Sequence, residues 1–196
     1  MSYSAEHKQK VRDNIIESAR VLFNRHGFEG VTIDRVMESS GLTRGGFYNH
    51  FKNKEELYSE AISSFLMGRG AQWRAEAGVD PTNLNPEMAR RMIQSYLSSE
   101  HLDDLDDQCP MIALPSDVAR ARPEVQLSYQ KLLEAMVSLF ERGLEKQSSE
   151  ARQKALSLAA LCVGGMVLAR ALPDSALARE VQTAARVSAD EITKNS

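Results

Sequence analysis

Cysteine, proline and aromatic residues are all scarce in this chain of 196 residues. The two cysteines, Cys109 and Cys162, lie far apart, and no Cys or Cys/His spacing indicates a disulfide framework or a metal site. Six prolines fall in only a few places, which leaves long stretches free to form helices. No alternation of polar and apolar residues predicts a strand. The sequence therefore predicts an all-α protein with no metal and no cofactor.

Long hydrophobic runs are also missing. The longest uncharged stretch, between Lys154 and Arg170, has about fifteen residues, fewer than the roughly twenty that a membrane-spanning helix needs. The first residues are polar and show no apolar segment typical of a signal peptide. With 42% hydrophobic and 26% charged residues, the composition is that of a soluble globular protein. We expect a cytoplasmic protein with no membrane partner.

Acidic residues are absent between Glu38 and Glu55, although the formal net charge of the chain is -3. The overall charge does not indicate a nucleic-acid partner, but the distribution of charge carries more information than the total. Four residues with basic side chains fall in this gap: Arg44, His50, Lys52 and Lys54. On charge alone, a solvated face explains this patch better than a binding surface does.

Apolar residues at spacings of three and four predict helices along the whole chain. The first helix covers 10–25 and ends at Gly27. Thr32 is expected to cap a second helix, 33–39, and Thr43 a short third helix that runs to Phe51. Two helices joined by a short turn containing glycine form a helix-turn-helix. A fourth helix is expected from Asn53 to about Gly78.

The third helix combines an inward apolar face with an exposed polar one. Phe47 and Phe51 are four residues apart and share the inward face. Gly45 and Gly46 stand in the first turn, where each costs roughly 1 kcal/mol relative to alanine. Close approach of the backbone to a ligand explains that cost, and the free amides of a first turn suit a phosphate or a base edge. Three side chains then remain for a partner: Arg44, Tyr48 and Asn49.

Residues 10–58 resemble the DNA-binding domain of the tetracycline-repressor (TetR) family of bacterial regulators. The matching segments are IIESA (15–19), LFNRHGF (22–28), VTIDRV (31–36), GLT (41–43) and GGFYNHFKNKEEL (45–57). The resemblance implies a third helix that enters the DNA major groove, where Arg44 binds guanine and Asn49 binds adenine or phosphate. Gly45 would permit close approach to a thymine methyl or to the backbone. Positions that usually contact phosphates in the family are Thr32, Thr43, Tyr48, His50 and Lys54, although His50 fits the domain core equally well.

After this DNA-binding domain, the chain is expected to form a helical ligand-binding and dimerisation domain. We place the domain boundary between residues 54 and 55, with domains 1–54 and 55–196 and about nine helices in all. After a turn-rich break at 80–86, helices are expected at 87–99, at 111–120 with a disturbance at Pro115, from Pro123 to about Lys146, at 155–169, and after Pro173. Residues 101–107 are expected to be an acidic loop.

The segment 155–169 is apolar on nearly every face and must be covered on all sides. In the family, the last two helices pair with those of a second subunit as a four-helix bundle, so we expect a two-fold homodimer. A helix buried inside one monomer is the alternative. The expected dimer-interface residues are Leu158, Leu161, Gly165, Leu168, Val181 and Ala185.

A ligand pocket is harder to place, because soft apolar side chains are common both in permissive cavities and in ordinary cores. For an unknown small hydrophobic ligand, the candidate lining residues are Met67, Trp73, Met88, Met92, Met111, Met136, Phe140 and Met166. Cys109 lies in a Cys-Pro segment that resembles one branch of the family, which leaves redox or electrophile sensing as an alternative. Cys162, among apolar residues, is expected to be inert core.

Enzymes and protein-binding adaptors are the competing classes. The acidic residues 103–107 lack a nearby His or Glu at ligand spacing, and no phosphate loop, dinucleotide fingerprint or nucleophile elbow occurs. An adaptor does not explain the paired glycines together with the basic patch. We expect a non-enzymatic repressor that binds a pseudo-palindromic operator in double-stranded DNA, with half-sites about one helical turn apart. A small ligand would release it by shifting the fourth helix.

Overall fold

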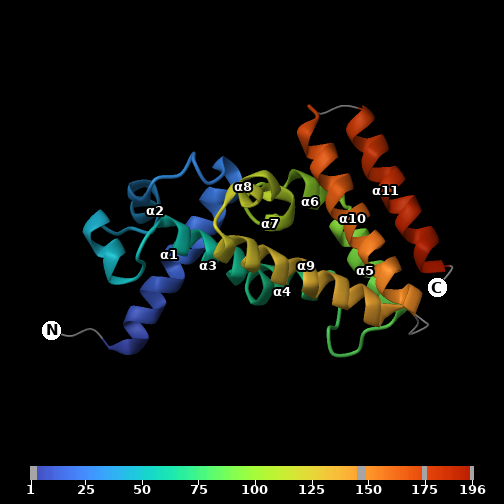
Figure 1. The fold of residues 1–196 in the computed structure, drawn as a ribbon, viewed down its shortest axis with the longest axis horizontal. Helices are drawn as coiled ribbons and strands as arrows, with labels where there is room; N and C mark the ends of the chain where they lie inside the picture. Colours follow the sequence, from blue (N-terminus) through green and yellow to red (C-terminus); the bar gives the residue numbers. More distant parts are fainter. Residues whose placement is uncertain (1–3, 145–148, 174–175, 195–196) are drawn as a thin grey trace. The chain divides into compact units, whose positions relative to one another are not determined.

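The computed structural model describes residues 4–144, 149–173 and 176–194. Within these ranges the chain forms eleven α-helices and one 3₁₀ helix, and no strand (Figure 1). The expected all-α fold is confirmed. Packing groups the residues into two units, of which unit 1 contains the described residues up to Gly68 together with Leu105–Gln130, and unit 2 contains Arg69–Asp104 and the described residues from Lys131 onward.

Unit 1 holds the N-terminal helices and a second, later segment of the chain. Its elements are α1 (Ala5–His26), α2 (Ile33–Ser39), the 3₁₀ helix η1 (Arg44–Asn49), α3 (Lys54–Met67), α7 (Pro110–Ala113), α8 (Pro115–Arg120) and the first part of α9 (Pro123–Gly143). Helix α1 packs against α2 and α3. The Tyr58 ring centroid lies 4.8 Å from that of Phe23 and 4.9 Å from that of Phe28. These rings form the core that holds the helix-turn-helix together.

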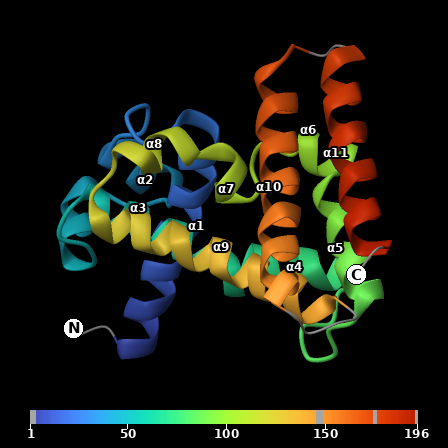
Figure 2. The same ribbon diagram turned by 45° about the vertical axis from the view of Figure 1, so that its right-hand side comes forward.

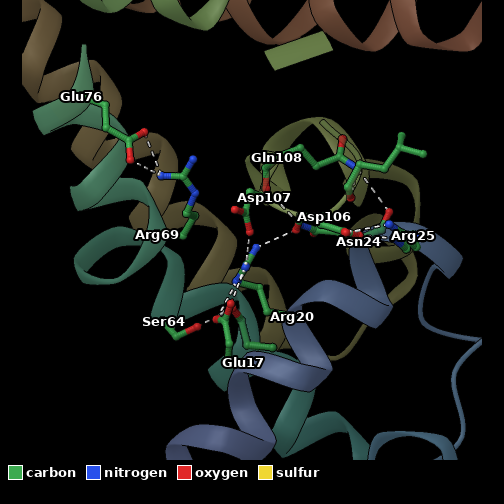
Figure 3. Close-up of polar contacts among 12 residues, drawn as sticks. Glu17, Arg20, Asn24, Arg25, Ser64, Arg69, Glu76, Asp106, Asp107 and Gln108 are labelled. Atoms are coloured by element: carbon green, nitrogen blue, oxygen red, sulfur yellow. Dashed lines mark hydrogen bonds and ion pairs between the residues drawn. The ribbon is translucent and has the colours of Figure 1, made fainter. Parts of the chain in front are cut away.

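A polar network around Arg20 joins α1 to residues 105–108 (Figure 3). The guanidinium donates to the Asp106 carbonyl at 2.8 Å and to Asp107 Oδ1 at 2.7 Å, and it also pairs with Glu17. Asn24 Nδ2 donates to the carbonyl of Gln108 at 2.9 Å. Burial alone would lower the pKa of Arg20, but the hydrogen bonds to Glu17 and Asp107 outweigh burial and raise it. Residues 105–108 are therefore fastened to the N-terminal helices.

Gly27 and Asp117 make a second connection within unit 1. Gly27 ends α1 with φ +68°, a conformation that favours glycine. A Cβ on Gly27 would lie 2.6 Å from Asp117 Oδ2, and the same oxygen accepts the Phe28 N–H at 2.9 Å. The glycine after α1, expected as a helix terminator, thus also admits α8 to close contact.

Unit 2 contains α4 (Arg69–Glu76), α5 (Pro86–Tyr96), α6 (Ser99–Asp103), the remainder of α9, α10 (Ser149–Ala171) and α11 (Ala176–Lys194). Helices α10 and α11 lie side by side in both ribbon views (Figures 1 and 2). Small residues bring them close, since a Cβ on Gly165 would come within 2.6 Å of the Ala185 Cβ. By length and composition alone α10 would suffice to cross a membrane, a property that core helices share.

The Trp73, Tyr96 and His101 rings cluster in unit 2, with the His101 centroid 4.9 Å from Trp73 and 4.8 Å from Tyr96. His101 is buried, and its Nδ1 donates to the Tyr96 carbonyl at 2.8 Å. Burial lowers the pKa of His101. The ring is therefore a neutral part of the core at neutral pH.

Several helix boundaries differ from the expected ones for local reasons. The expected helix from Asn53 to about Gly78 is two helices, because the chain leaves helical geometry at Gly68, where a Cβ would lie 2.8 Å from the Ser64 carbonyl. Ser98 caps a separate helix α6, so residues 101–103 of the expected acidic loop are helical. Pro115 starts a new helix, so the expected 111–120 helix is also two. Helix α9 ends at Gly143, and Lys146 lies outside the described residues.

Candidate nucleic-acid interface

The turn between α2 and η1 sets the direction of the second element of the helix-turn-helix. Thr32 caps α2 as expected, its Oγ1 accepting the Arg35 N–H at 3.2 Å. At the other end, the Leu42 N–H donates to the Met37 carbonyl at 2.8 Å, and the Gly41 N–H donates to the Glu38 carbonyl at 2.9 Å. This is the bonding of a Schellman motif, which requires a left-handed residue, and Gly41 has φ +72°.

The third helix is a six-residue 3₁₀ helix, Arg44–Asn49, rather than the expected α-helix to Phe51. Thr43 occupies the N-cap position but makes no side-chain capping bond, so that expectation is wrong. The first bond is instead the i to i+3 contact from the Gly46 N–H to the Thr43 carbonyl, 3.0 Å. Two adjacent glycines weaken α-helix formation, and 3₁₀ geometry is common in such short pieces.

Phe47 and Phe51 anchor this segment in the core of unit 1, as their spacing predicted; their exposed fractions are 0% and 2%. Tyr48 on the other face is 61% exposed. Arg44, Gly45 and Asn49 are exposed as well. We call the segment 43–49 the reader tip. Phe47 within the tip and Phe51 just beyond it are buried, while the outer face of the tip stays exposed.

Gly45 has no packing reason to be a glycine in the isolated subunit. A Cβ built on Gly45 meets no atom of the described residues within 4 Å beyond its own helix and chain neighbours, and its φ is not in the left-handed region. Gly46 differs slightly, because its Cβ would lie 3.6 Å from Met37 Cε. Since neither sterics nor backbone conformation requires Gly45, the absent side chain is available to a partner that approaches the tip.

Arg44 is paired with an acidic residue that the sequence reading did not assign to the site. Its Nη1 donates to Asp34 Oδ2 at 2.5 Å, and the two side chains are 61% and 56% exposed. Asp34 stands in the first turn of α2, where a negative charge also favours the helix dipole. No helical spacing relates residues ten apart across a turn, so periodicity could not have found this pair.

The two other basic candidates turn partly toward the protein. Lys54 is half-buried, and its Nζ donates to the Val31 carbonyl at 2.9 Å while lying 4.0 Å from the centre of the Phe28 ring. His50 is also half-buried, and burial, followed by the charges of Lys8 and Arg12, lowers its pKa. The exposed charge of the expected basic patch therefore comes mainly from Arg44 and Lys52.

The expected ligand-pocket residues do not gather in one unit. Met67 and Met111 belong to unit 1, and Met67 is 80% exposed. The other six lie in unit 2: Trp73, Met88, Met92, Met136, Phe140 and Met166. Four of these six are buried, while Trp73 and Met88 are half-buried.

Cys109 and three expected interface residues are buried in the subunit itself. Cys109 is 2% exposed and Cys162 is fully buried, and burial raises the pKa of the Cys162 thiol. Leu158, Gly165 and Ala185 lie in the packing of α10 within unit 2. Among the remaining interface candidates, Leu161 and Val181 are half-buried and Leu168 is 59% exposed.

Comparison with known proteins agrees with this geometry. The family model for bacterial regulatory proteins of the tetR family matches residues 15–61, which span α1 to α3. The chain is 32% identical over 146 residues to the uncharacterized HTH-type transcriptional regulator YfiR of Bacillus subtilis, covering 72% of this chain and 67% of that protein. It is 45% identical over 68 residues to the HTH-type transcriptional repressor AcnR of Corynebacterium diphtheriae, of which it covers 35%.

Solved structures share the fold over nearly the whole chain. The crystal structure of Escherichia coli NemR in its reduced form superposes with a TM-score of 0.74 at 18% identity, covering 93% of this chain and 96% of that one. A TetR-family regulator from Agrobacterium tumefaciens superposes with a TM-score of 0.69 at 22% identity, covering 94% and 98%. The helix-turn-helix geometry, the family match and the extended similarity to YfiR lead to one conclusion: the chain belongs to the TetR family of bacterial regulators and is a DNA-binding transcriptional regulator, not an enzyme.

Proposed function

We propose that the protein is a homodimeric repressor whose two reader tips bind successive major grooves of a pseudo-palindromic operator in double-stranded DNA. The observation that carries this proposal is the exposed tip with an unhindered Gly45 beside three outward side chains, Arg44, Tyr48 and Asn49. A two-fold dimer presents two identical tips, so the operator contains two half-sites related by two-fold symmetry. Because the tips enter successive major grooves, the half-sites lie about one helical turn apart.

Within each half-site, the roles follow from side-chain chemistry. Arg44 donates two hydrogen bonds to guanine, and Asn49 reads adenine or falls back on phosphate. The exposed hydroxyls of Thr32, Thr43 and Tyr48 donate to phosphates, which fixes the register of the reader. Lys54 and His50 contact phosphate only if their side chains turn outward from their present positions, so we assign them the smallest contributions.

The dimer forms through the outer faces of α10 and α11. Leu156, Leu168, Leu177 and Val187 are each between 46% and 59% exposed, although they are large and apolar. Leu161 and Val181 are half-buried on the same two helices. Covering these side chains with the same surface of a second copy removes apolar area from water and satisfies two-fold symmetry. Leu158, Gly165 and Ala185 then support the interface from inside the subunit.

A small hydrophobic ligand would bind in unit 2 and release the operator. The half-buried Trp73 and Met88 and the buried Met92, Met136, Phe140 and Met166 offer aromatic and thioether surface for it. Such a ligand acts only by binding the DNA-incompetent state more tightly than the DNA-bound state. We place this regulation in the cytoplasm, where the chromosome is. The burial of Cys109 gives no support to direct thiol sensing in this conformation.

Selection of binding sites from random duplex DNA with the full-length protein tests the proposal. We expect enrichment of an inverted repeat, and a complex whose mass corresponds to a protein dimer. Arg44→Ala and Tyr48→Ala should weaken binding to the selected duplex, whereas Arg152→Ala, in unit 2, should not. Failure to enrich any sequence, or equal effects of the three substitutions, would contradict the proposed reader. Dilution to a stable monomer that retains full affinity would contradict the dimer.

A further inference from the structure

The pair formed by Asp34 and Arg44 places an acidic side chain in a surface that must approach phosphates. Asp34 comes from α2 and Arg44 from the reader tip, so the contact crosses the turn of the helix-turn-helix. An ion pair with both partners this exposed contributes at most about 1 kcal/mol to folding. Meanwhile, an acid near DNA weakens binding to every sequence through charge repulsion. A modest gain in stability is therefore set against a cost in DNA affinity.

The geometry leaves Arg44 able to read a base while it stays paired. A guanidinium has five N–H donors. Asp34 engages Nη1, and within the described residues the edge formed by Nη2 and Nε remains open for a bidentate contact with guanine. Arginine has many rotamers, and holding it in one geometry reduces the entropy lost when it binds. Pairing also neutralises Arg44, which reduces its attraction to phosphates that carry no sequence information.

We propose that Asp34 is a specificity-determining residue, which orients Arg44 toward a guanine and disfavours its capture by phosphate. Specificity is a difference between two affinities, and it rises when the wrong complex is weakened as well as when the right one is strengthened. This inference rests on the proposed placement of the reader tip in the major groove.

The experiment compares Asp34→Ala with Glu38→Ala, a control that also removes an exposed acid from α2. Affinities of the full-length variants are measured for the duplex selected by the wild-type protein and for a random-sequence duplex. For Asp34→Ala, we expect the ratio of the two affinities to fall about tenfold, the scale of one well-oriented base contact. Random-duplex binding should become steeper in salt, by about 0.9 in log–log slope for each new phosphate contact. Glu38→Ala should change both affinities alike and preserve the ratio.

A double-mutant cycle with Arg44→Ala identifies the route of the effect. In the Arg44→Ala background, Asp34→Ala should no longer lower the ratio, and Asp34→Glu in the wild-type background should restore part of it. If Asp34→Ala leaves the ratio of the two affinities unchanged while Arg44→Ala still weakens binding to the selected sequence, this inference is wrong but the proposed reader tip is not. If Arg44→Ala itself keeps the wild-type preference, the proposed reader fails. Thermal unfolding of each variant checks that it folds.

Discussion

Two arginines of unit 1 make the same kind of contact in opposite surroundings. Arg20 and Arg44 each pair with carboxylates, yet Arg20 is 2% exposed and Arg44 is 61% exposed. Arg20 donates to Glu17, to Asp107 and to a backbone carbonyl, so its donors are distributed over fixed partners. Arg44 donates through a single nitrogen to the residues that the structure describes. The buried Arg20 stabilises the fold, whereas the exposed Arg44 has N–H donors that can bind a partner molecule.

The sequence alone does not distinguish these two arginines, although their burial predicts that one supports folding and the other supports binding. Loss of a buried charged partner leaves polar groups unsatisfied inside the protein, and the cost appears in folding. Loss of an exposed one is absorbed by water, and any cost appears only when a ligand needs it. The comparison therefore predicts that stability and DNA affinity respond to different residues of the same small unit.

The largest effect is expected for Arg20→Ala. Removing the guanidinium deletes its buried hydrogen bonds to the Asp106 carbonyl and to Asp107, and we expect about 3 kcal/mol less free energy of unfolding. Denaturant titration followed by circular dichroism measures it. Arg25→Ala, which removes the exposed pair with Asp106, should cost under about 1 kcal/mol. Equal losses in the two variants would show that burial does not separate these arginines.

Arg44→Ala should weaken DNA binding while leaving the stability of the fold nearly unchanged, the opposite of Arg20→Ala. Its free energy of unfolding should stay within about 0.5 kcal/mol of the wild type, as for most surface changes. Binding to the selected duplex should weaken by about 1–3 kcal/mol, the value of a bidentate base contact. Fluorescence anisotropy with labelled duplex gives the affinity, and denaturant titration gives the stability. A destabilised Arg44→Ala with unaltered DNA affinity would invert the comparison.

Two glycines extend the contrast from side chains to backbone. Gly45→Ala should raise the free energy of unfolding, by up to about 1 kcal/mol, because alanine is the better helix former and its Cβ meets nothing. The added methyl group should still weaken operator binding by about 1–2 kcal/mol if DNA packs against this position. Gly27→Ala is the matched variant, since its positive φ and the close Asp117 should make it destabilising. Unimpaired operator binding by Gly45→Ala would argue against close approach.

The smallest effect concerns pH. Burial lowers the pKa of His101, so protons bind the unfolded chain before the folded one as the pH falls. Stability is therefore complete above the unfolded pKa of about 6.5 and declines below it, by at most about 1.4 kcal/mol per pH unit. His50 shifts in the same direction. Denaturant titrations between pH 7 and about 5 should show a shallower slope for His101→Gln. If His101→Gln keeps the wild-type slope of stability against pH, groups other than His101 cause the pH dependence.

Local signals in the sequence were enough for most helices and for the outline of the reader. The cap at Thr32, the inward Phe47 and Phe51 and the glycine turn at Gly41 all act within a few residues, where spacing and propensity are informative. The same signals missed the end of α3 at Gly68 and the 3₁₀ form of η1. In both cases the apolar periodicity continues, and only the backbone changes.

Contacts between distant residues could not be predicted in this way. Arg20 and Asp107 are 87 positions apart, and the residues around each of them do not indicate that the two side chains meet. The grouping of Leu105–Gln130 with the N-terminal helices has the same origin, and it differs from the expected division into 1–54 and 55–196. The pocket and interface candidates were chosen as apolar residues on helices. Periodicity does not tell whether such a residue faces its own core, a partner or a ligand.

The separation of buried anchors from exposed side chains at the reader tip has a consequence for protein engineering. Phe47 and Phe51 fasten the segment, while the exposed Arg44, Tyr48 and Asn49 take no part in the core. Libraries randomised at these three outward positions, with Asp34 as a fourth, should therefore yield folded proteins in high proportion. Retargeting such a regulator to a chosen promoter then becomes a problem of surface chemistry, solved without redesigning the scaffold.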